Sequence, residues 1–334
     1  MSAGGMMLAG VCEAPGRFAA LERAMPSEVP EGWELCDVAA IGICGTDYHI
    51  FEGKHPFLDY PRVIGHELSC HVRGGPRDGE LCVVNPYLSC GSCRACRRGR
   101  PNCCSRIEVL GVHRDGGMCA RIAVPSANLY PATGLDAGAA AMVEFLAIGA
   151  HAVARSGVGP GDLALVAGAG PIGLGSALFA RLAGAEVHLA DLSPARLAAA
   201  QRVFGFERLH QPGPEMLSGP LAEGFDTVFD ATGSAASIEA GISYLAHGGT
   251  LVLVSVVKGR IGVEDAEFHK REARIIGSRN ALKPDFERVM AAMRAGEVPV
   301  AGIATERLRL SELPARLPAL AAARDDIIKV LVTP

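Results

Sequence analysis

The sequence predicts an α/β protein in which a β-rich domain is combined with a domain built on a doubly wound parallel sheet. Its 334 residues are enough for roughly two domains. Up to about residue 150 the chain is rich in glycine, proline and cysteine, with short β-like runs. From about residue 151 to 280, short apolar runs alternate with alanine-rich helical segments, and this alternation is typical of a parallel sheet.

The first part of the chain contains two clear β-like runs, at residues 33–43 and 80–88, separated by turn signals. In the second part, strands are predicted at residues 163–166, 186–190, 226–230 and 250–256. Helices are predicted at residues 172–183 and 193–204, the second opened by Ser193 as cap and Pro194 in the first turn. The last part should add a helix at 285–295 and a strand at 327–332, and residues 153–161 are a candidate boundary.

A glycine-rich turn stands between the first predicted strand and helix of the second part. It has the spacing GxGxxG, formed by Gly168, Gly170 and Gly173, and Asp191 ends the next strand. In a strand–turn–helix context this is the dinucleotide-binding fingerprint. Asp191 would bind the ribose hydroxyls and repel a 2′-phosphate, which favours NAD over NADP, although Arg196 could approach a phosphate. The alternative is an ordinary βαβ unit that binds no cofactor and whose glycines allow the helix and strand to pack closely.

The composition argues against several classes of partner. A formal net charge of −4 gives no general attraction to nucleic acid or to an anionic membrane. The N-terminus has no basic region ahead of a long apolar run, so no secretion signal is expected. Without such a signal, the eleven cysteines favour metal binding or free thiols over a disulfide framework, and we expect the cytoplasm.

Five cysteines fall within residues 90–104. Cys90, Cys93 and Cys96 are followed by Cys103 and Cys104, and four thiolates at such spacing can close a tetrahedral structural zinc site. Spacing alone does not decide between Cys103 and Cys104. A redox disulfide pair and a zinc-ribbon contact with nucleic acid remain as alternatives, the latter because four arginines lie in the segment: Arg94, Arg97, Arg98 and Arg100.

Two earlier stretches suggest a second, catalytic metal site. Cys44 offers a thiolate, His66 an imidazole and Glu67 a carboxylate, and three protein ligands plus water is the arrangement of a catalytic zinc. Each residue also has an ordinary reading, as a buried thiol, a core histidine and a surface glutamate.

The chain resembles the zinc-dependent medium-chain alcohol dehydrogenase family over essentially its whole length. The resemblance lies in the order and spacing of four motifs: CGTDxH, GHE, CxxCxxCx7C and GxGxxG. The resemblance implies a GroES-like catalytic domain made of residues 1–150 and 281–334, and a Rossmann NAD-binding domain at 151–280. It also implies two zinc ions per chain, one catalytic and one structural, and a homodimer or homotetramer that pairs through edge strands, with residues 248–259 as a candidate edge.

The resemblance assigns site residues by position. Thr46 and His49 fall on a proton relay. The catalytic-zinc positions are Cys44, His66, Glu67 and Glu144, where either glutamate binds directly or through water. The structural-zinc positions are Cys90, Cys93, Cys96 and Cys104. The cofactor positions are Gly168, Gly170, Ile172, Gly173, Asp191, Arg196, Val254, Ser255, Val256 and Ser278.

The substrate is predicted less directly. Glu144 in place of a thiolate resembles polyol and sugar dehydrogenases, whereas Ile50, where the sorbitol branch has an aromatic residue, argues against sorbitol. Four segments resemble bacterial enzymes that oxidise the fifth carbon of L-galactonate or L-gulonate: residues 102–104, 111–117, 266–280 and 285–289. Arg279 or Lys270 could meet the substrate carboxylate. The alternatives are a sorbitol- or xylitol-type dehydrogenase, a zinc-free quinone or enoyl reductase, and a non-catalytic nucleotide sensor.

Overall fold

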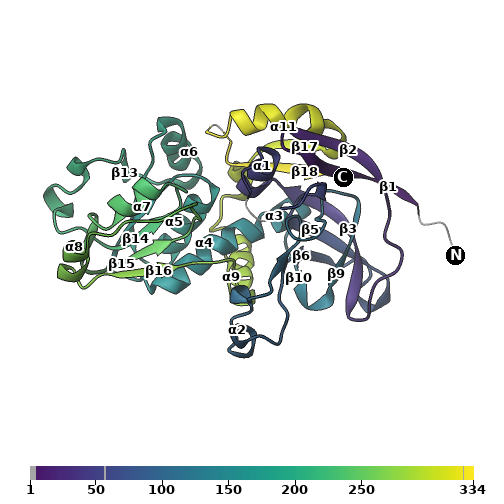
Figure 1. The fold of residues 1–334 in the computed structure, drawn as a ribbon, viewed down its shortest axis with the longest axis horizontal. Helices are drawn as coiled ribbons and strands as arrows, with labels where there is room; N and C mark the ends of the chain where they lie inside the picture. The colour runs from purple at the N-terminus through teal and green to yellow at the C-terminus, as the bar shows by residue number, and fades with distance from the viewer. Residues whose placement is uncertain (1–4, 56–57, 326) are drawn as a thin grey trace. The chain divides into compact units, whose positions relative to one another are not determined.

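A computed structural model describes residues 5–55, 58–325 and 327–334 of the chain (Figure 1). The chain forms two compact units. Unit 1 consists of residues 1–144 and 290–334, so it combines the two ends of the chain, and unit 2 consists of residues 145–289. The sequence places these divisions at residues 150 and 280. Within the described residues, no helix has both the length and the apolar character needed to cross a membrane.

Unit 1 is built on β-sheets. Its largest sheet has the order β10-β6-β5-β3-β18-β17, with β9 also paired to β3, so a strand from the C-terminal end lies beside strands from the first part of the chain. A smaller sheet has the order β2-β1-β4, and β7 pairs with β8. The strands are β1 Met6–Ala14, β2 Arg17–Ala24, β3 Trp33–Gly42, β4 Arg62–Val63, β5 Glu67–Arg73, β6 Leu81–Val84, β7 Tyr87–Leu88, β8 Glu108–Val109, β9 Arg121–Pro125, β10 Leu129–Pro131, β17 Ala304–Arg309 and β18 Lys329–Thr333.

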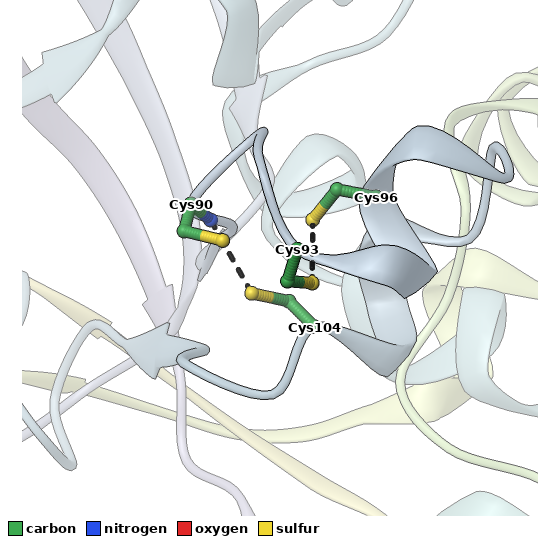
Figure 2. Close-up of side chains that lie close together, drawn as sticks. All are labelled: Cys90, Cys93, Cys96 and Cys104. Carbon is green, nitrogen blue, oxygen red and sulfur yellow. Dashed lines mark hydrogen bonds between the residues drawn. The ribbon is translucent and has the colours of Figure 1, made fainter.

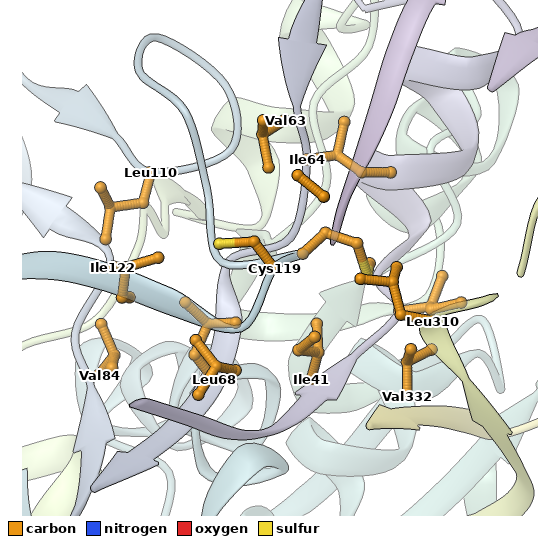
Figure 3. Packing of buried hydrophobic residues seen from close by; sticks show 14 of the residues in the cluster. Ile41, Val63, Ile64, Leu68, Val84, Leu110, Cys119, Ile122, Leu310 and Val332 are labelled. Atoms are coloured by element: carbon orange, nitrogen blue, oxygen red, sulfur yellow. The ribbon is translucent and has the colours of Figure 1, made fainter. Parts of the chain in front are cut away.

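The core of unit 1 lies between these sheets (Figure 3). Ile41 of β3, Leu68 of β5 and Val332 of β18 are fully buried in one cluster, which ties both chain ends together through apolar contact. The helices of this part are α1 Gly45–Phe51, α2 Arg94–Arg97, α3 Ala137–Ala141, α10 Val300–Ile303 and α11 Leu313–Ala322, while α9 Lys283–Arg294 crosses the second division between the units.

Unit 2 contains a six-stranded sheet whose order is β13-β12-β11-β14-β15-β16, and every pairing in it is parallel. Because the order reverses between β11 and β14, the sheet is doubly wound, with its switch point at the carboxyl ends of these two strands. The predicted fold class is confirmed. The helix α4 Val143–Ser156 crosses the first division between the units. The other elements are β11 Leu163–Ala167, α5 Pro171–Leu182, β12 Glu186–Ala190, α6 Pro194–Phe204, β13 Leu209–His210, β14 Phe225–Asp230, α7 Ala235–Gly241, β15 Leu245–Leu253, α8 Asp265–Lys270 and β16 Arg274–Gly277.

Several local predictions are confirmed and three are wrong. The strand at 186–190 is found as predicted, and Ser193 caps α6 by accepting a bond from the Arg196 N–H. The run at 80–88 is two strands rather than one, because Pro86 lacks an N–H and interrupts the ladder. The strand at 250–256 ends at Leu253, and residues 248–259 are not an edge, since β16 covers that side of β15.

Candidate metal and cofactor sites

The pairing of β3 with β5 brings Cys44, His66 and Glu67 together. Gly42, at the end of β3, lies opposite Glu67, at the start of β5, and Cys44 follows as the N-cap of α1. The possible ligand atoms of Cys44, His66 and Glu67 all lie within 4.8 Å of one another. Gly42 makes room for this approach, because a Cβ there would lie 2.2 Å from Glu67 Oε2.

Asp47 joins the two segments that carry these side chains. Its Oδ2 accepts a bond of 2.9 Å from the Cys44 N–H, and its Oδ1 accepts one of 3.2 Å from the Gly65 N–H. The same Oδ1 lies 3.9 Å from His66 Nδ1. Burial raises the pKa of Asp47. This residue is part of CGTDxH, but the sequence reasoning assigned it no role.

Lys329 is the second residue that sequence reasoning missed. Its Nζ lies 2.7 Å from both carboxylate oxygens of Glu67 and 3.2 Å from the Ile43 carbonyl oxygen, and both side chains of the ion pair are fully buried. Burial works against the charged amine, but Glu67 prevails and raises the pKa of Lys329. A lysine within the apolar run of residues 327–332 was the available signal.

Glu144 has a different partner. It lies in the first turn of α4, is 3% exposed, and accepts a short hydrogen bond at Oε1 from the Tyr87 hydroxyl. Burial raises the pKa of Glu144 to about 7, and burial next to Glu144 raises the pKa of Tyr87 well above its usual value. The sequence reasoning gave Tyr87 no role.

The donor set of this cluster fits a zinc ion. Zinc accepts thiolate, imidazole and carboxylate ligands together, and the side chains here supply all three types. His66 Nδ1 is buried with no hydrogen-bond partner. Although burial alone would lower the pKa of His66, the Cys44 thiolate and the nearby carboxylates raise it well above its usual value. The cluster therefore favours a positive charge, which a divalent cation would supply.

The two relay candidates, Thr46 and His49, both lie on α1. Cys44 Sγ and Thr46 Oγ1 lie 3.6 Å apart, so Thr46 is in contact with the candidate ligand. His49 is exposed on the same helix, where it can exchange protons with water. Ile50, the next residue, is fully buried in the core of unit 1.

The cysteine-rich segment forms a second cluster, in which four side chains point toward one another (Figure 2). The sulfur atoms of Cys90, Cys93, Cys96 and Cys104 lie within 4.8 Å of one another, and Cys103 is exposed outside the group. Backbone N–H groups of Cys90 and Arg106 lie 3.3 Å from Cys104 Sγ. The Arg106 guanidinium, followed by backbone N–H groups, lowers the pKa of Cys90 to about 5. Four thiols so arranged suit a closed tetrahedral zinc site.

The glycine-rich turn follows β11 at the switch point of the parallel sheet. Gly168 has a φ of +98°, which favours glycine, and a Cβ on Gly173 would lie 1.7 Å from the Gly168 carbonyl oxygen. A Cβ on Gly170 would meet nothing within 4 Å, so the turn is open at the N-terminus of α5, where Ile172 also lies. This combination leaves space for a phosphate beside a helix N-terminus.

The other cofactor candidates lie at the carboxyl ends of strands in the same sheet. Asp191 follows β12; its carboxylate accepts bonds from the Ala169 and Ser193 N–H groups, and Arg196 Nη1 lies 3.7 Å from it. Three more cofactor candidates follow β15, namely Val254, Ser255 and Val256, and one, Ser278, follows β16. The substrate candidate Arg279 is the next residue after Ser278. Ser278 Oγ is buried without a hydrogen-bond partner, whereas Val256 and Arg279 are exposed.

Comparison with known proteins gives consistent matches. Residues 30–134 match the alcohol dehydrogenase GroES-like domain, and residues 171–295 match the zinc-binding dehydrogenase domain. L-Galactonate-5-dehydrogenase of Escherichia coli K12 is 40% identical over 323 residues, covering 91% of this chain and 92% of that protein.

Two solved structures resemble this one along nearly all of their length. A zinc-binding dehydrogenase from Sinorhizobium meliloti 1021 bound to NADP has a TM-score of 0.90 and 30% identity, covering 99% of this chain and 100% of that one. An alcohol dehydrogenase from E. coli CFT073 complexed with NADH has a TM-score of 0.91 and 27% identity, with the same coverage. The two structures carry different nicotinamide cofactors.

Proposed function

The chain belongs to the zinc-dependent medium-chain alcohol dehydrogenase family, in its polyol and sugar-acid branch, and we propose that it transfers a hydride from a secondary hydroxyl of a sugar acid to NAD. The substrate we propose is L-galactonate or L-gulonate, oxidised at the fifth carbon. The observation that carries the reaction class is the approach of Cys44, His66 and Glu67 to within 4.8 Å.

The residues of the candidate site have separate proposed roles in metal binding and proton transfer. The clustered side chains of Cys44, His66 and Glu67 would hold the catalytic zinc, with Glu144 as the further ligand that the family resemblance assigns. The structural zinc would be held by Cys90, Cys93, Cys96 and Cys104. When bound, zinc supplies Lewis acidity that lowers the pKa of a hydroxyl, and the nicotinamide accepts a hydride. Thr46, in contact with Cys44, would take the released proton and pass it to His49, whose exposed imidazole would deliver it to water.

The preference for NAD is supported by Asp191, whose carboxylate follows β12 and would repel the 2′-phosphate of NADP. Arg196 works in the opposite direction, because its cation lies 3.7 Å from the same carboxylate. Initial rates with NAD and with NADP test the preference, and faster turnover with NADP would reverse the assignment.

The substrate is tested by following NAD reduction with a panel of hexonates, hexitols and pentitols. We expect L-galactonate or L-gulonate to give the highest kcat/KM. Turnover of hexitols or pentitols alone would favour the sorbitol- or xylitol-type alternative. Two zinc ions per chain are expected from metal analysis, whereas no zinc would favour a quinone reductase and one would favour a nucleotide sensor.

Changing Cys44 to Ala provides the matched test of the catalytic site. The variant should keep one zinc ion per chain and still bind NADH, because the thiol cluster and the glycine-rich turn are untouched. Turnover should fall at least about 100-fold, since a ligand of the catalytic metal is lost. Unchanged turnover would remove Cys44 from the mechanism.

We also propose a homodimer or homotetramer that pairs through β16, which is one of the two outer strands of the unit 2 sheet, the other being β13. Ile275 on this strand is 37% exposed, and an open strand edge is a template for pairing with a second copy. Sedimentation velocity measures the subunit number. We place the protein in the cytoplasm, because all eleven cysteines lie within the described residues as free thiols and zinc-binding thiols must be reduced.

A further inference from the structure

The two carboxylates of the candidate catalytic site are held by donors of different charge. Glu67 binds the Lys329 ammonium through both oxygens, so its negative charge is compensated within the protein. Glu144 binds the Tyr87 hydroxyl, a neutral donor that stabilises a carboxylate without cancelling its charge. Both glutamates are buried, so each depends on the donor that its carboxylate oxygens meet, and for Glu144 that donor is the Tyr87 hydroxyl.

Tyr87 is rigidly placed for this contact. Its backbone N–H donates to Asn85 Oδ1 at 3.1 Å, and Asn128 Nδ2 donates to its carbonyl oxygen at 3.1 Å. The residue is 9% exposed and belongs to β7, three positions before Cys90 of the thiol cluster. Because both backbone polar groups of Tyr87 are hydrogen-bonded, its side chain loses little conformational freedom when its hydroxyl orients Glu144.

We propose that Tyr87 is a positioning residue for the catalytic zinc site: its hydroxyl holds Oε1 of Glu144 and thereby orients a carboxylate that would serve the metal directly or through water. This inference rests on the proposed function, because it requires a metal at Cys44 and His66. Partners that orient a metal-binding side chain typically change metal affinity 10- to 100-fold when removed. Tyr87 acts through Glu144 and has no direct role in hydride transfer.

The test compares Tyr87→Phe with Tyr130→Phe, in protein whose catalytic zinc is replaced by Co²⁺. Tyr130 is the control for the backbone anchor. It is 6% exposed in the same unit and its hydroxyl accepts a bond from Asn85, whose Oδ1 accepts the Tyr87 N–H, so Tyr130→Phe removes a hydroxyl from the same network and leaves the bond to Glu144 in place. In Tyr87→Phe, the visible cobalt bands should shift and a chelator should remove the metal about 10- to 100-fold faster. In Tyr130→Phe, the cobalt bands should not shift, and the rate of metal loss should stay within about twofold of that of the parent protein. Tyr87→Met, which also lacks the hydroxyl, replaces the Phe variant if that variant folds poorly.

A double-mutant cycle separates positioning from general packing. If Tyr87 acts through Glu144, adding Tyr87→Phe to Glu144→Gln should change the rate of metal loss by less than about twofold. Additive effects, or a Tyr87→Phe variant that matches Tyr130→Phe, would overturn the inference. The proposed function fails by a different result: parent protein with no metal at the catalytic site, or no turnover of any alcohol in the panel.

Discussion

Lys329 Nζ lies 2.7 Å from both carboxylate oxygens of Glu67, a residue 262 positions earlier in the chain. The two side chains are 1% and 0% exposed, so the pair is removed from water. Removing one partner of such a pair leaves a buried charge uncompensated and typically costs about 3–5 kcal/mol. We therefore expect Lys329→Met to lower the free energy of unfolding in urea by about this amount when a chelator keeps the protein metal-free. Zinc should restore part of the loss, because a divalent cation beside Glu67 replaces the missing charge.

Lys54→Met is the matched control for this prediction. Lys54 also pairs with a glutamate, at 3.0 Å from Glu52, but its side chain is 67% exposed. Exposed ion pairs contribute about 0–1 kcal/mol, so this variant should unfold at nearly the parental urea concentration. If both lysine variants lose the same free energy of unfolding, the Glu67–Lys329 pair contributes no more to stability than an exposed ion pair does.

The thiol cluster predicts different results for two adjacent cysteines. Cys104 is buried within the cluster and Cys103 is exposed outside it. Four-ligand structural zinc sites are worth about 10–16 kcal/mol, so losing one ligand should cost roughly 3 kcal/mol, or about 100-fold in zinc affinity. Cys104→Ser should therefore reduce the zinc content measured by metal analysis and lower Tm, whereas Cys103→Ser should do neither. The reverse result would move the ligand to Cys103.

Local patterns were enough to predict much of the candidate site, and distant partners were not. The spacing of Cys90, Cys93 and Cys96 is short-range information, and the glycine-rich turn is recognisable from the strand and helix around it. The partners of Tyr87 and Lys329 could not be predicted in this way, because their glutamates lie 57 and 262 residues away and meet them only through tertiary folding. The lysine in the apolar run of residues 327–332 marks an unusual position but does not identify Glu67.

The sheet edge was mispredicted for a similar reason. Residues 248–259 look like a long apolar strand, but β15 stops at Leu253 and pairs on its outer side with β16. That outer strand has only four residues, RIIG, and begins with an arginine, so its pattern is too short to predict. A strand's neighbours are set by the order of the whole sheet, which periodicity does not contain.

Two glycines of α5 give a matched test of the phosphate-binding turn. A Cβ on Gly173 would lie 1.7 Å from the Gly168 carbonyl oxygen, which is backbone and cannot move aside cheaply. A Cβ on Gly175 would lie no closer than 3.5 Å to any atom, and alanine favours a helix by up to about 1 kcal/mol over glycine. We expect Gly173→Ala to weaken NADH binding at least about tenfold, as measured by fluorescence titration. The added Cβ would displace the turn, and a displaced turn cannot approach the phosphate as closely. Gly175→Ala should bind NADH normally, and comparable binding by both variants would contradict the role of the turn.

The paired imidazoles of His188 and His210 predict how unit 2 responds to acid. His188 Nδ1 lies 2.8 Å from His210 Nε2 across the β12–β13 pairing. Burial lowers the pKa of both, the second also through the first, while Glu186 partly opposes the shift at His188. Unfolded imidazoles bind protons with a pKa of about 6.5. As the pH falls below that value, the unfolded chain takes up these protons first, so the free energy of unfolding is fully retained above it and declines below it.

We therefore expect the urea midpoint to fall between about pH 6.5 and 5, and the fall to be shallower in His188→Gln, which removes one of the two groups. His247→Gln is the control, because His247 is an exposed histidine of the same sheet, in β15. The urea midpoint of His247→Gln should change with pH as that of the parent protein does. If His188→Gln leaves the slope unchanged, the loss of stability in acid has another source, and the His188–His210 contact does not resist protonation as its burial predicts.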